Sequence, residues 1–151
     1  MTPREFDALD DAFVAGYAHL VRLASLIVGA DGEDAVMEAF VRVRSRPRPI
    51  DDPAAYLRTA VLNECRSRWR RDLRRPRMSE RSAGGSSPEV DTLWEVLARL
   101  PPDQRAVVAL RFYEDLTIPQ IAEALDMRDG TVKSHLHRAK KALHSLLGDE
   151  P

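Results

Sequence analysis

Two basic stretches carry the residues whose types and spacing are best suited to chemistry. Seven arginines and only one acid, Asp72, lie between residues 66 and 77. A second set of basic and hydrogen-bonding side chains lies between residues 128 and 141. The formal net charge of the whole chain is only −1, so the charge is segregated along the sequence. This segregation predicts a polyanionic partner that meets one surface of the protein.

No pattern in the sequence predicts catalysis or a cofactor. The histidines and the single Cys65 do not form a zinc spacing, and no phosphate-binding glycine loop or nucleophile elbow occurs. Asp51 and Asp52 precede Pro53, an arrangement typical of a helix cap rather than of an acid–base pair. With no signal-peptide layout and no apolar run near the roughly 20 residues that span a membrane, we expect a cytoplasmic protein without membrane insertion or a small-molecule substrate.

Apolar periodicity predicts an all-α fold made of two small helical domains. Residues 76–89 are rich in Ser, Gly and Pro and are predicted to be a flexible linker between domains 1–75 and 90–151. Recurrence at three- and four-residue steps predicts helices over 6–28, 33–44, 53–73, 90–100 and 102–113.

Residues 115–143 are predicted to form two helices joined by a tight turn. Thr117 and Gln120 fit a capping box at the start of the first helix. Val132, Leu136 and Ala139 share one face of the second helix, which leaves a basic outer face. The arrangement is typical of a DNA-binding helix-turn-helix, and an antiparallel helical hairpin with a solvated basic face is the alternative.

With both modules considered, the chain resembles the bacterial RNA polymerase sigma factors of the extracytoplasmic-function class (group 4 of the sigma-70 family). Leu97–Leu143 resembles region 4 of that family, which reads the −35 promoter element. The segments YAHLVRLASLIVG, EDAVMEAFVRV and DDPAAYLRTAVLNECRSRWRR resemble region 2, which grips the polymerase clamp and melts the −10 element. The resemblance implies an alternative sigma factor, not itself an enzyme, that binds core RNA polymerase and directs promoter-specific transcription initiation.

The resemblance also implies three sets of site residues. Those that bind the polymerase clamp are Asp34, Glu38 and Phe40. The −10 set combines an amide able to read an extruded base with cations for the phosphates: Asn63, Arg66, Arg68, Arg70 and Arg71. The −35 set comprises Arg128, Thr131, Lys133, Ser134, His135 and Arg138. The loop 47–52 matches the family's loop that captures a flipped base, an anti-sigma factor is an implied partner, and the active protein would be nucleoid-associated.

Some positions depart from the family's usual residues. Met37 stands where Gln is usual and Arg44 where an aromatic is usual. Asp126 replaces the usual Gly of the turn and tolerates a left-handed backbone, whereas Arg128 replaces a capping Ser, so Asp129 is expected to cap the second helix. Two alternatives therefore stay open. One is a degenerate sigma-like interaction protein that does not open DNA, and the other is a free-standing helix-turn-helix regulator that binds symmetric sites as a dimer.

Overall fold

Residues 3–45, 50–74 and 88–148 are described by the structure, a computed structural model. Every regular element among them is helical, which confirms the predicted all-α class. Residues 47–49 of the predicted base-capturing loop and residues 76–87 of the predicted linker lie outside the described residues. In chain order the elements are α1 (Pro3–Val28), the 3₁₀ turn η1 (Gly29–Asp31), α2 (Gly32–Ser45), α3 (Pro53–Arg74), α4 (Pro88–Leu97), α5 (Pro102–Val108), the π-helical turn η2 (Ala109–Tyr113), α6 (Ile118–Leu125) and α7 (Asp129–Gly148).

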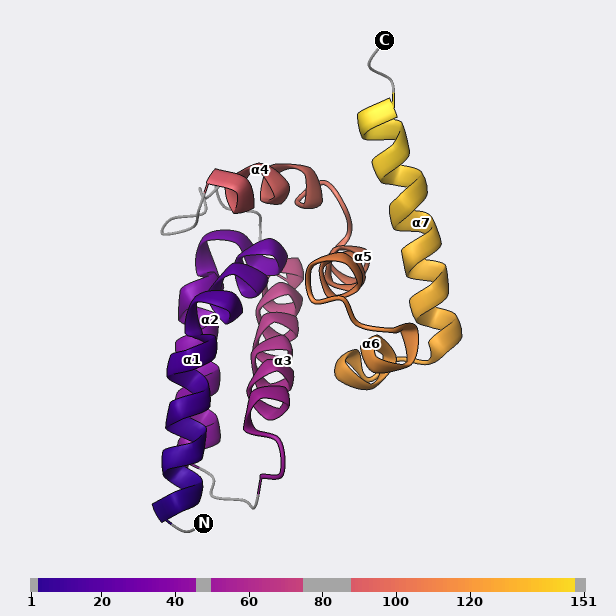
Figure 1. Ribbon diagram of the computed structural model, residues 1–151. Coiled ribbons are helices and arrows are strands. Elements are labelled where there is room, and N and C mark those ends of the chain that lie inside the picture. Colours follow the sequence, from indigo (N-terminus) through magenta and orange to yellow (C-terminus); the bar gives the residue numbers. More distant parts are fainter. Residues whose placement is uncertain (1–2, 46–49, 75–87, 149–151) are drawn as a thin grey trace.

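The helices α1, α2 and α3 form a bundle around a shared apolar core (Figure 1). Apolar residues from all three helices, such as Ile27, Val36 and Leu57, are at most 1% exposed. The backbone NH of Ala55 donates to Asp52 Oδ1 at 3.2 Å, so the predicted aspartate cap begins α3. A local signal in the sequence therefore fixes the start of the helix that carries the arginines, at the predicted residue Pro53.

A glycine and a tryptophan join the end of α1 to the C-terminal half of the chain. Gly29 has a φ of 71°, and a Cβ at this position would lie 2.7 Å from the Trp94 ring of α4. Glycine therefore permits both the left-handed turn and the close approach of α4. The guanidinium of Arg105 in α5 lies 4.9 Å from the centre of the same ring. Trp94 thus packs between the end of α1 and the start of α5.

The N-terminal stretch is more apolar than the sequence prediction allowed. Phe6–Ser45 contains a window that is long and apolar enough, by length and composition, to cross a membrane. This finding differs from the expectation that no such run exists. Nevertheless, 44% of the window is buried within the fold, and η1 divides the stretch into two packed helices. Its apolar residues supply the core between α1, α2 and α3.

The C-terminal helices form the predicted helix-turn-helix. Thr117 Oγ1 accepts from the backbone NH of Gln120 at 3.3 Å, while Gln120 Oε1 accepts from the backbone NH of Thr117 at 2.8 Å, which confirms the capping box. Asp126 is left-handed as expected, with φ 53° and ψ 52°. The backbone NH of Met127 donates to the Ala122 carbonyl at 2.9 Å, the bond of a Schellman motif that ends α6.

Two local details of this half differ from the predictions. The helix α7 already includes Asp129 as its first residue, and the Val132 NH donates to the Arg128 carbonyl at 3.0 Å. The expected Asp129 cap is therefore wrong, because the backbone enters the helix one residue earlier. In addition, the helix predicted over 102–113 widens into the π-turn η2 after Val108, which nothing in the apolar spacing indicated.

The two predicted modules contact each other through the end of η2. Arg22 Nε of α1 donates to the Tyr113 hydroxyl at 2.9 Å, and the His19 ring stacks on the Tyr113 ring. The side chain of Glu114 is 8% exposed, and its carboxylate pairs with His19. The same carboxylate lies 3.7 Å from the guanidinium Nη1 of Arg58 in α3. In Figure 1, α5, α6 and α7 accordingly lie beside the α1–α3 bundle, with α4 across its end.

Candidate nucleic-acid interface

The outer face of α7 presents most of the predicted −35 residues to solvent. Val132 and Ala139 are fully buried and Leu136 is buried, so this stripe fixes the rotation of the helix against α5 and α6. The residues left exposed by that rotation are Arg128, Thr131, Lys133, Ser134 and Arg138. A helix with one packed face and exposed cations and hydroxyls on the other has the form of a major-groove reader.

His135 differs from its neighbours on α7. Its side chain is half-buried, and within the described residues its Nδ1 atom is shut from solvent without a hydrogen-bond partner. The sequence prediction placed it with the DNA-facing residues, but its position on the edge of the packed stripe makes it the least accessible of the six. Since Leu136 is buried next to it, the edge of the apolar face covers part of the ring.

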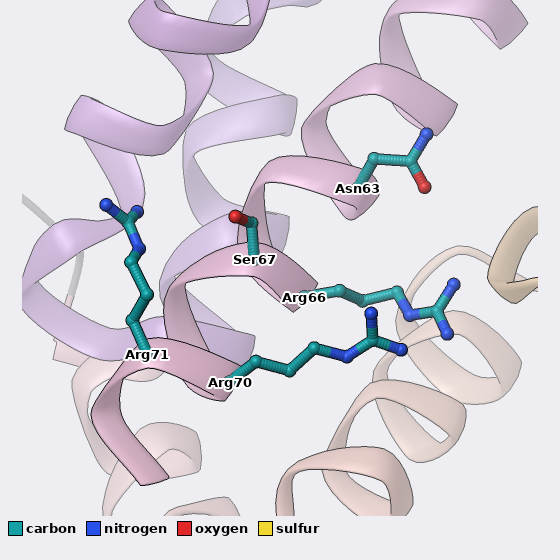
Figure 2. Close-up of a pocket in the computed structure, with 5 residues that line it drawn as sticks. All are labelled: Asn63, Arg66, Ser67, Arg70 and Arg71. Atoms are coloured by element: carbon teal, nitrogen blue, oxygen red, sulfur yellow. The ribbon is translucent and has the colours of Figure 1, made fainter. Parts of the chain in front are cut away.

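The basic face of α3 carries the predicted −10 residues in two different arrangements. Asn63, Arg66 and Arg70 point to the same side of the helix (Figure 2). Arg71 extends to the opposite side of the view, and Arg68 is bonded along its own helix. The guanidinium Nε of Arg66 is shut from solvent and has no hydrogen-bond partner among the described residues.

A buried carboxylate lies beneath this basic face. Glu64 is 2% exposed, although it is a charged residue on a surface helix. Arg68 Nε donates to Glu64 Oε2 at 3.1 Å, and the guanidinium Nη2 of Arg71 lies 3.5 Å from the same oxygen. The guanidinium Nη1 of Arg42 from α2 lies 3.0 Å from Glu64 Oε1. The two atoms are not aligned for a hydrogen bond, so the contact is electrostatic. Three guanidiniums therefore surround one carboxylate, and two of the four predicted −10 arginines belong to this cluster.

Two hollows meet at Asn63. One has a volume of about 350 Å³ and is lined by Asn63, Arg66, Ser67, Arg70 and Arg71 (Figure 2). The other, about 290 Å³, lies between α2 and α3 and has a more apolar lining: Ala39, Arg42, Val43, Tyr56, Thr59, Ala60 and Asn63. The amide of Asn63 has both a donor and an acceptor, so it can recognise the edge of a nucleobase held between a cationic and an apolar surface.

Comparison with known proteins agrees with the resemblance stated above. A family model described as sigma-70, region 4 matches residues 91–143. Over 127 residues the chain is 35% identical to the RNA polymerase sigma-E factor of Streptomyces coelicolor, covering 78% of this chain and 72% of that relative. Over 147 residues it is 33% identical to the ECF RNA polymerase sigma factor SigL of Mycobacterium tuberculosis, covering 86% of this chain and 83% of the relative.

The chain belongs to the RNA polymerase sigma factors of the extracytoplasmic-function (ECF) class. It is therefore an alternative sigma factor, which directs transcription initiation by RNA polymerase. Sigma factors are not enzymes, since the polymerase performs the chemistry, and those of this class are cytoplasmic proteins.

Solved structures share the fold of this sigma factor. The sigma factor RpoE from Bartonella quintana, in complex with the anti-sigma factor NepR, superposes with a TM-score of 0.71 at 20% identity, covering 94% of this chain and 98% of that one. CnrH, in complex with the cytosolic domain of CnrY, superposes with a TM-score of 0.67 at 22% identity, covering 96% and 90%. The similarity in fold therefore extends over most of the chain.

The exposed face of α2 carries two of the three residues predicted to bind polymerase. Asp34 and Glu38 are exposed, whereas Phe40 stacks on Phe13 of α1 at a centroid distance of 3.8 Å. Phe40 therefore belongs to the packing between α1 and α2 and does not share the face of the two acids. Sequence reasoning missed two apolar residues that do share it: Met37 is 42% exposed and Val41 is 59% exposed. Their spacing from Asp34, at three and seven positions, was the available signal.

Arg44 has a structural role in this sigma factor. The sequence departs here from an aromatic usual in the family, and Arg44 instead makes a bidentate pair with Asp10 of α1, with both contacts at 3.0 Å. The hydrogen bond from Arg44 lowers the pKa of the Asp10 carboxyl below its usual value. The guanidinium also lies 5.0 Å from the centre of the Phe6 ring. Arg44 thus holds the end of α2 against the start of α1.

Proposed function

We propose that α3 of this sigma factor holds the non-template strand of the −10 element while α7 reads the −35 element. The observation that carries the assignment of α3 is the position of Asn63 between a cationic hollow and a more apolar groove. A single-stranded nucleic acid needs both surfaces, because its phosphates are charged and its unstacked bases are largely apolar. Arg66 and Arg70 would hold phosphates, with Arg68 and Arg71 adding to the positive field.

The assignment of α7 rests on its exposed polar face. Thr131, Lys133 and Ser134 lie near the start of the helix, where side chains of a helix-turn-helix reach base edges. Arg128 and Arg138 lie on either side of them and would hold the phosphate backbone, which sets the register of the helix on the duplex. His135, half-buried, would make at most a peripheral contact.

The acidic and apolar face of α2 is the proposed contact with the polymerase clamp. Asp34 and Glu38 would steer the encounter with a basic partner surface and fix its register. Met37 and Val41 supply exposed apolar area between and beside the two acids. Phe40 would act indirectly, because its stacking on Phe13 sets the position of α2.

Binding of both promoter elements requires the two modules to separate. The centres of the −10 and −35 elements are about 25 base pairs apart, which is about 85 Å of B-DNA. A packed chain of this length has a radius of gyration of about 15 Å. The contacts of Glu114 with His19 and Arg58 would therefore break when domains 1–75 and 90–151 engage one promoter. The linker would be the predicted segment 76–89 without its last two residues, because α4 begins at Pro88.

An anti-sigma factor is the third proposed partner. Support comes from the fold, since the similar structures of RpoE and CnrH are complexes with NepR and CnrY, respectively. A partner that binds both modules would stabilise their packed arrangement and oppose engagement of the two promoter elements. Association with the nucleoid would follow only when the sigma factor is free to join the polymerase.

Run-off transcription by core polymerase on a pool of promoter fragments tests the proposed function. The protein should produce defined new transcripts, which Asp34→Arg should weaken by lowering polymerase binding. Asp11→Asn, an exposed acid of α1 away from the α2 face, serves as a control and should leave the transcripts unchanged. Polymerase binding without any transcript would contradict the proposal and favour a degenerate sigma-like protein. DNA binding without polymerase binding would favour a free-standing regulator.

A further inference from the structure

The Glu64 cluster consists of the buried Glu64 carboxylate and the guanidiniums of Arg42, Arg68 and Arg71. An apolar residue in place of Glu64 would pack the core of the bundle equally well. A buried carboxylate is costly unless cations and hydrogen-bond donors compensate it. Here the compensation comes from the basic face itself, through Arg68 and Arg71 of α3 and Arg42 of α2. The Arg42 and Arg71 side chains are 56% and 54% exposed, so water reaches their outer sides. The carboxylate therefore acts on residues that remain at the surface.

The cluster divides the arginines of α3 into two groups. Arg68 and Arg71 each have an acidic partner within 3.5 Å. Arg66 and Arg70 line the hollow beside Asn63, and within the described residues neither has an ion pair with an acid shorter than 4.0 Å. Arg71 lines the same hollow but is paired with Glu64. A strand lying there would therefore meet two cations without an acidic partner, one cation already paired with an acid, and one base-reading amide.

We propose that Glu64 is a positioning residue of the −10 surface, an inference that rests on the proposed function of α3. It holds Arg68 and Arg71 along the helix and offsets part of their charge. The strand is then bound by Arg66, Arg70 and Asn63. Glu64 thereby limits the number of phosphates that α3 neutralises and leaves a larger share of the discrimination to Asn63.

The physical basis is the balance between non-specific and specific contacts. Each phosphate neutralised by a mobile cation adds affinity for any sequence, while contacts to bases carry the discrimination. An arginine already paired with a carboxylate has part of its charge offset and some of its donors engaged, so it gains less from a phosphate than an unpaired arginine does. The buried acid therefore reduces sequence-independent binding without removing the arginines.

The test is the salt dependence of strand binding by the sigma factor in complex with core polymerase. The probe is a fluorescent single-stranded oligonucleotide with the −10 sequence of a promoter found by run-off transcription, beside a scrambled oligonucleotide of the same length. Glu64→Gln removes one negative charge while keeping the side-chain shape. Asp11→Asn makes the same charge change at an exposed site near the start of α1 and is the matched control.

Release of Arg68 and Arg71 should steepen the slope of log Kd against log salt by about 0.7 or more in Glu64→Gln, because each newly neutralised phosphate of a single strand adds about that amount. The scrambled strand should gain more affinity than the −10 strand, so the ratio of the two Kd values should fall. Glu64→Asp keeps the charge and should restore most of the wild-type slope. An unchanged slope in Glu64→Gln, equal to that of Asp11→Asn, would overturn the proposal.

Single arginine variants keep the proposal testable even where Glu64→Gln fails to fold. Arg66→Ala and Arg70→Ala should each reduce the salt slope by about 0.7. Arg71→Ala, on an exposed side chain of the cluster, should reduce it by less than half of that. Equal losses for all three variants would contradict the role of Glu64 but leave the proposed function intact. Absence of strand binding by the wild-type complex would contradict the proposed function itself, and this inference with it.

Discussion

The two helices proposed to contact DNA differ in whether their basic side chains are paired with acids. On α3, a buried carboxylate binds two of the arginines, and the available groups gather around Asn63. On α7, Lys133 and Arg138 are exposed, and within the described residues no acid lies within 4.0 Å of either. The difference suits the two targets, because a melted strand is flexible and must be held in one geometry, whereas a duplex already has a fixed geometry.

The largest effect should come from the base-reading amide of α3. Asn63→Ala removes a group that is exposed and packs against nothing essential, so the fold should persist. We expect transcription from a cognate promoter to fall about tenfold or more, since one base contact contributes about 1–3 kcal/mol. Run-off transcription measures the loss. Ser67→Ala, which lines the same hollow, is the control and should change transcription little.

Equal losses in Asn63→Ala and Ser67→Ala would mean that the hollow tolerates no change at all. The assignment of base reading to Asn63 would then be wrong.

A smaller effect is expected on α7, where several exposed groups share the contact. Lys133→Ala should weaken binding of holoenzyme to a duplex −35 fragment and reduce the salt slope by about 0.9 if Lys133 meets a phosphate. If Lys133 reads a base, the slope should stay closer to the wild-type value and discrimination against a mutated −35 element should fall instead. Fluorescence anisotropy over a salt series distinguishes the two results.

Lys140→Ala provides the matched control for Lys133→Ala. The Lys140 ammonium lies 5.8 Å from the centre of the Phe112 ring and is therefore engaged with η2. Its loss should leave DNA affinity almost unchanged. A loss equal to that of Lys133→Ala would show that only the overall charge of α7 matters, and the proposed base contacts of that helix would be wrong.

The caps of the two modules should contribute similar stability. Thr117→Ala removes the side-chain acceptor of the α6 capping box, and Asp52→Ala removes the acceptor at the start of α3. Each should lower the free energy of unfolding by about 1 kcal/mol, as measured by urea denaturation. Thr131→Ala, exposed on α7, is the control with an expected change near zero. An unchanged free energy of unfolding in either variant would contradict the contribution of that cap.

The buried face of α3 should be inaccessible to thiol reagents in the folded protein, whereas the outer face of the helix is exposed to solvent. Cys65 is fully buried next to Glu64, and burial raises the pKa of its thiol to about 12. The thiol is therefore neutral well above pH 8, and a thiol reagent should react slowly with the folded protein at pH 8. Unfolding in concentrated urea should restore rapid reaction. Rapid labelling without denaturant would contradict the closed packing beneath the arginines.

Local signals in the sequence predicted most of the fold. The capping box at Thr117, the aspartate cap at Asp52 and the left-handed Asp126 each depend on a few neighbouring residues, and each prediction is confirmed. The Asp129 cap failed because the backbone enters α7 one residue earlier, and local sequence does not distinguish between these adjacent starts.

Features that depend on contacts between distant residues were not predictable. Apolar spacing could not reveal that Arg42 of another helix would meet Glu64. Nor could it show that Phe40 would stack on Phe13, or that Glu114 would pair across the two modules. These contacts decide which of the predicted site residues remain available to a partner.

Two variants combined with two altered promoters would test whether α3 reads the −10 element and α7 the −35 element. Run-off transcription would be measured for wild type, Asn63→Ala and Lys133→Ala on a cognate promoter, on one with a mutated −10 element and on one with a mutated −35 element. We predict that Asn63→Ala loses sensitivity to the −10 change alone and Lys133→Ala to the −35 change alone. If each variant keeps the wild-type sensitivity to both changes, the assignment of α3 and α7 to the two elements is wrong.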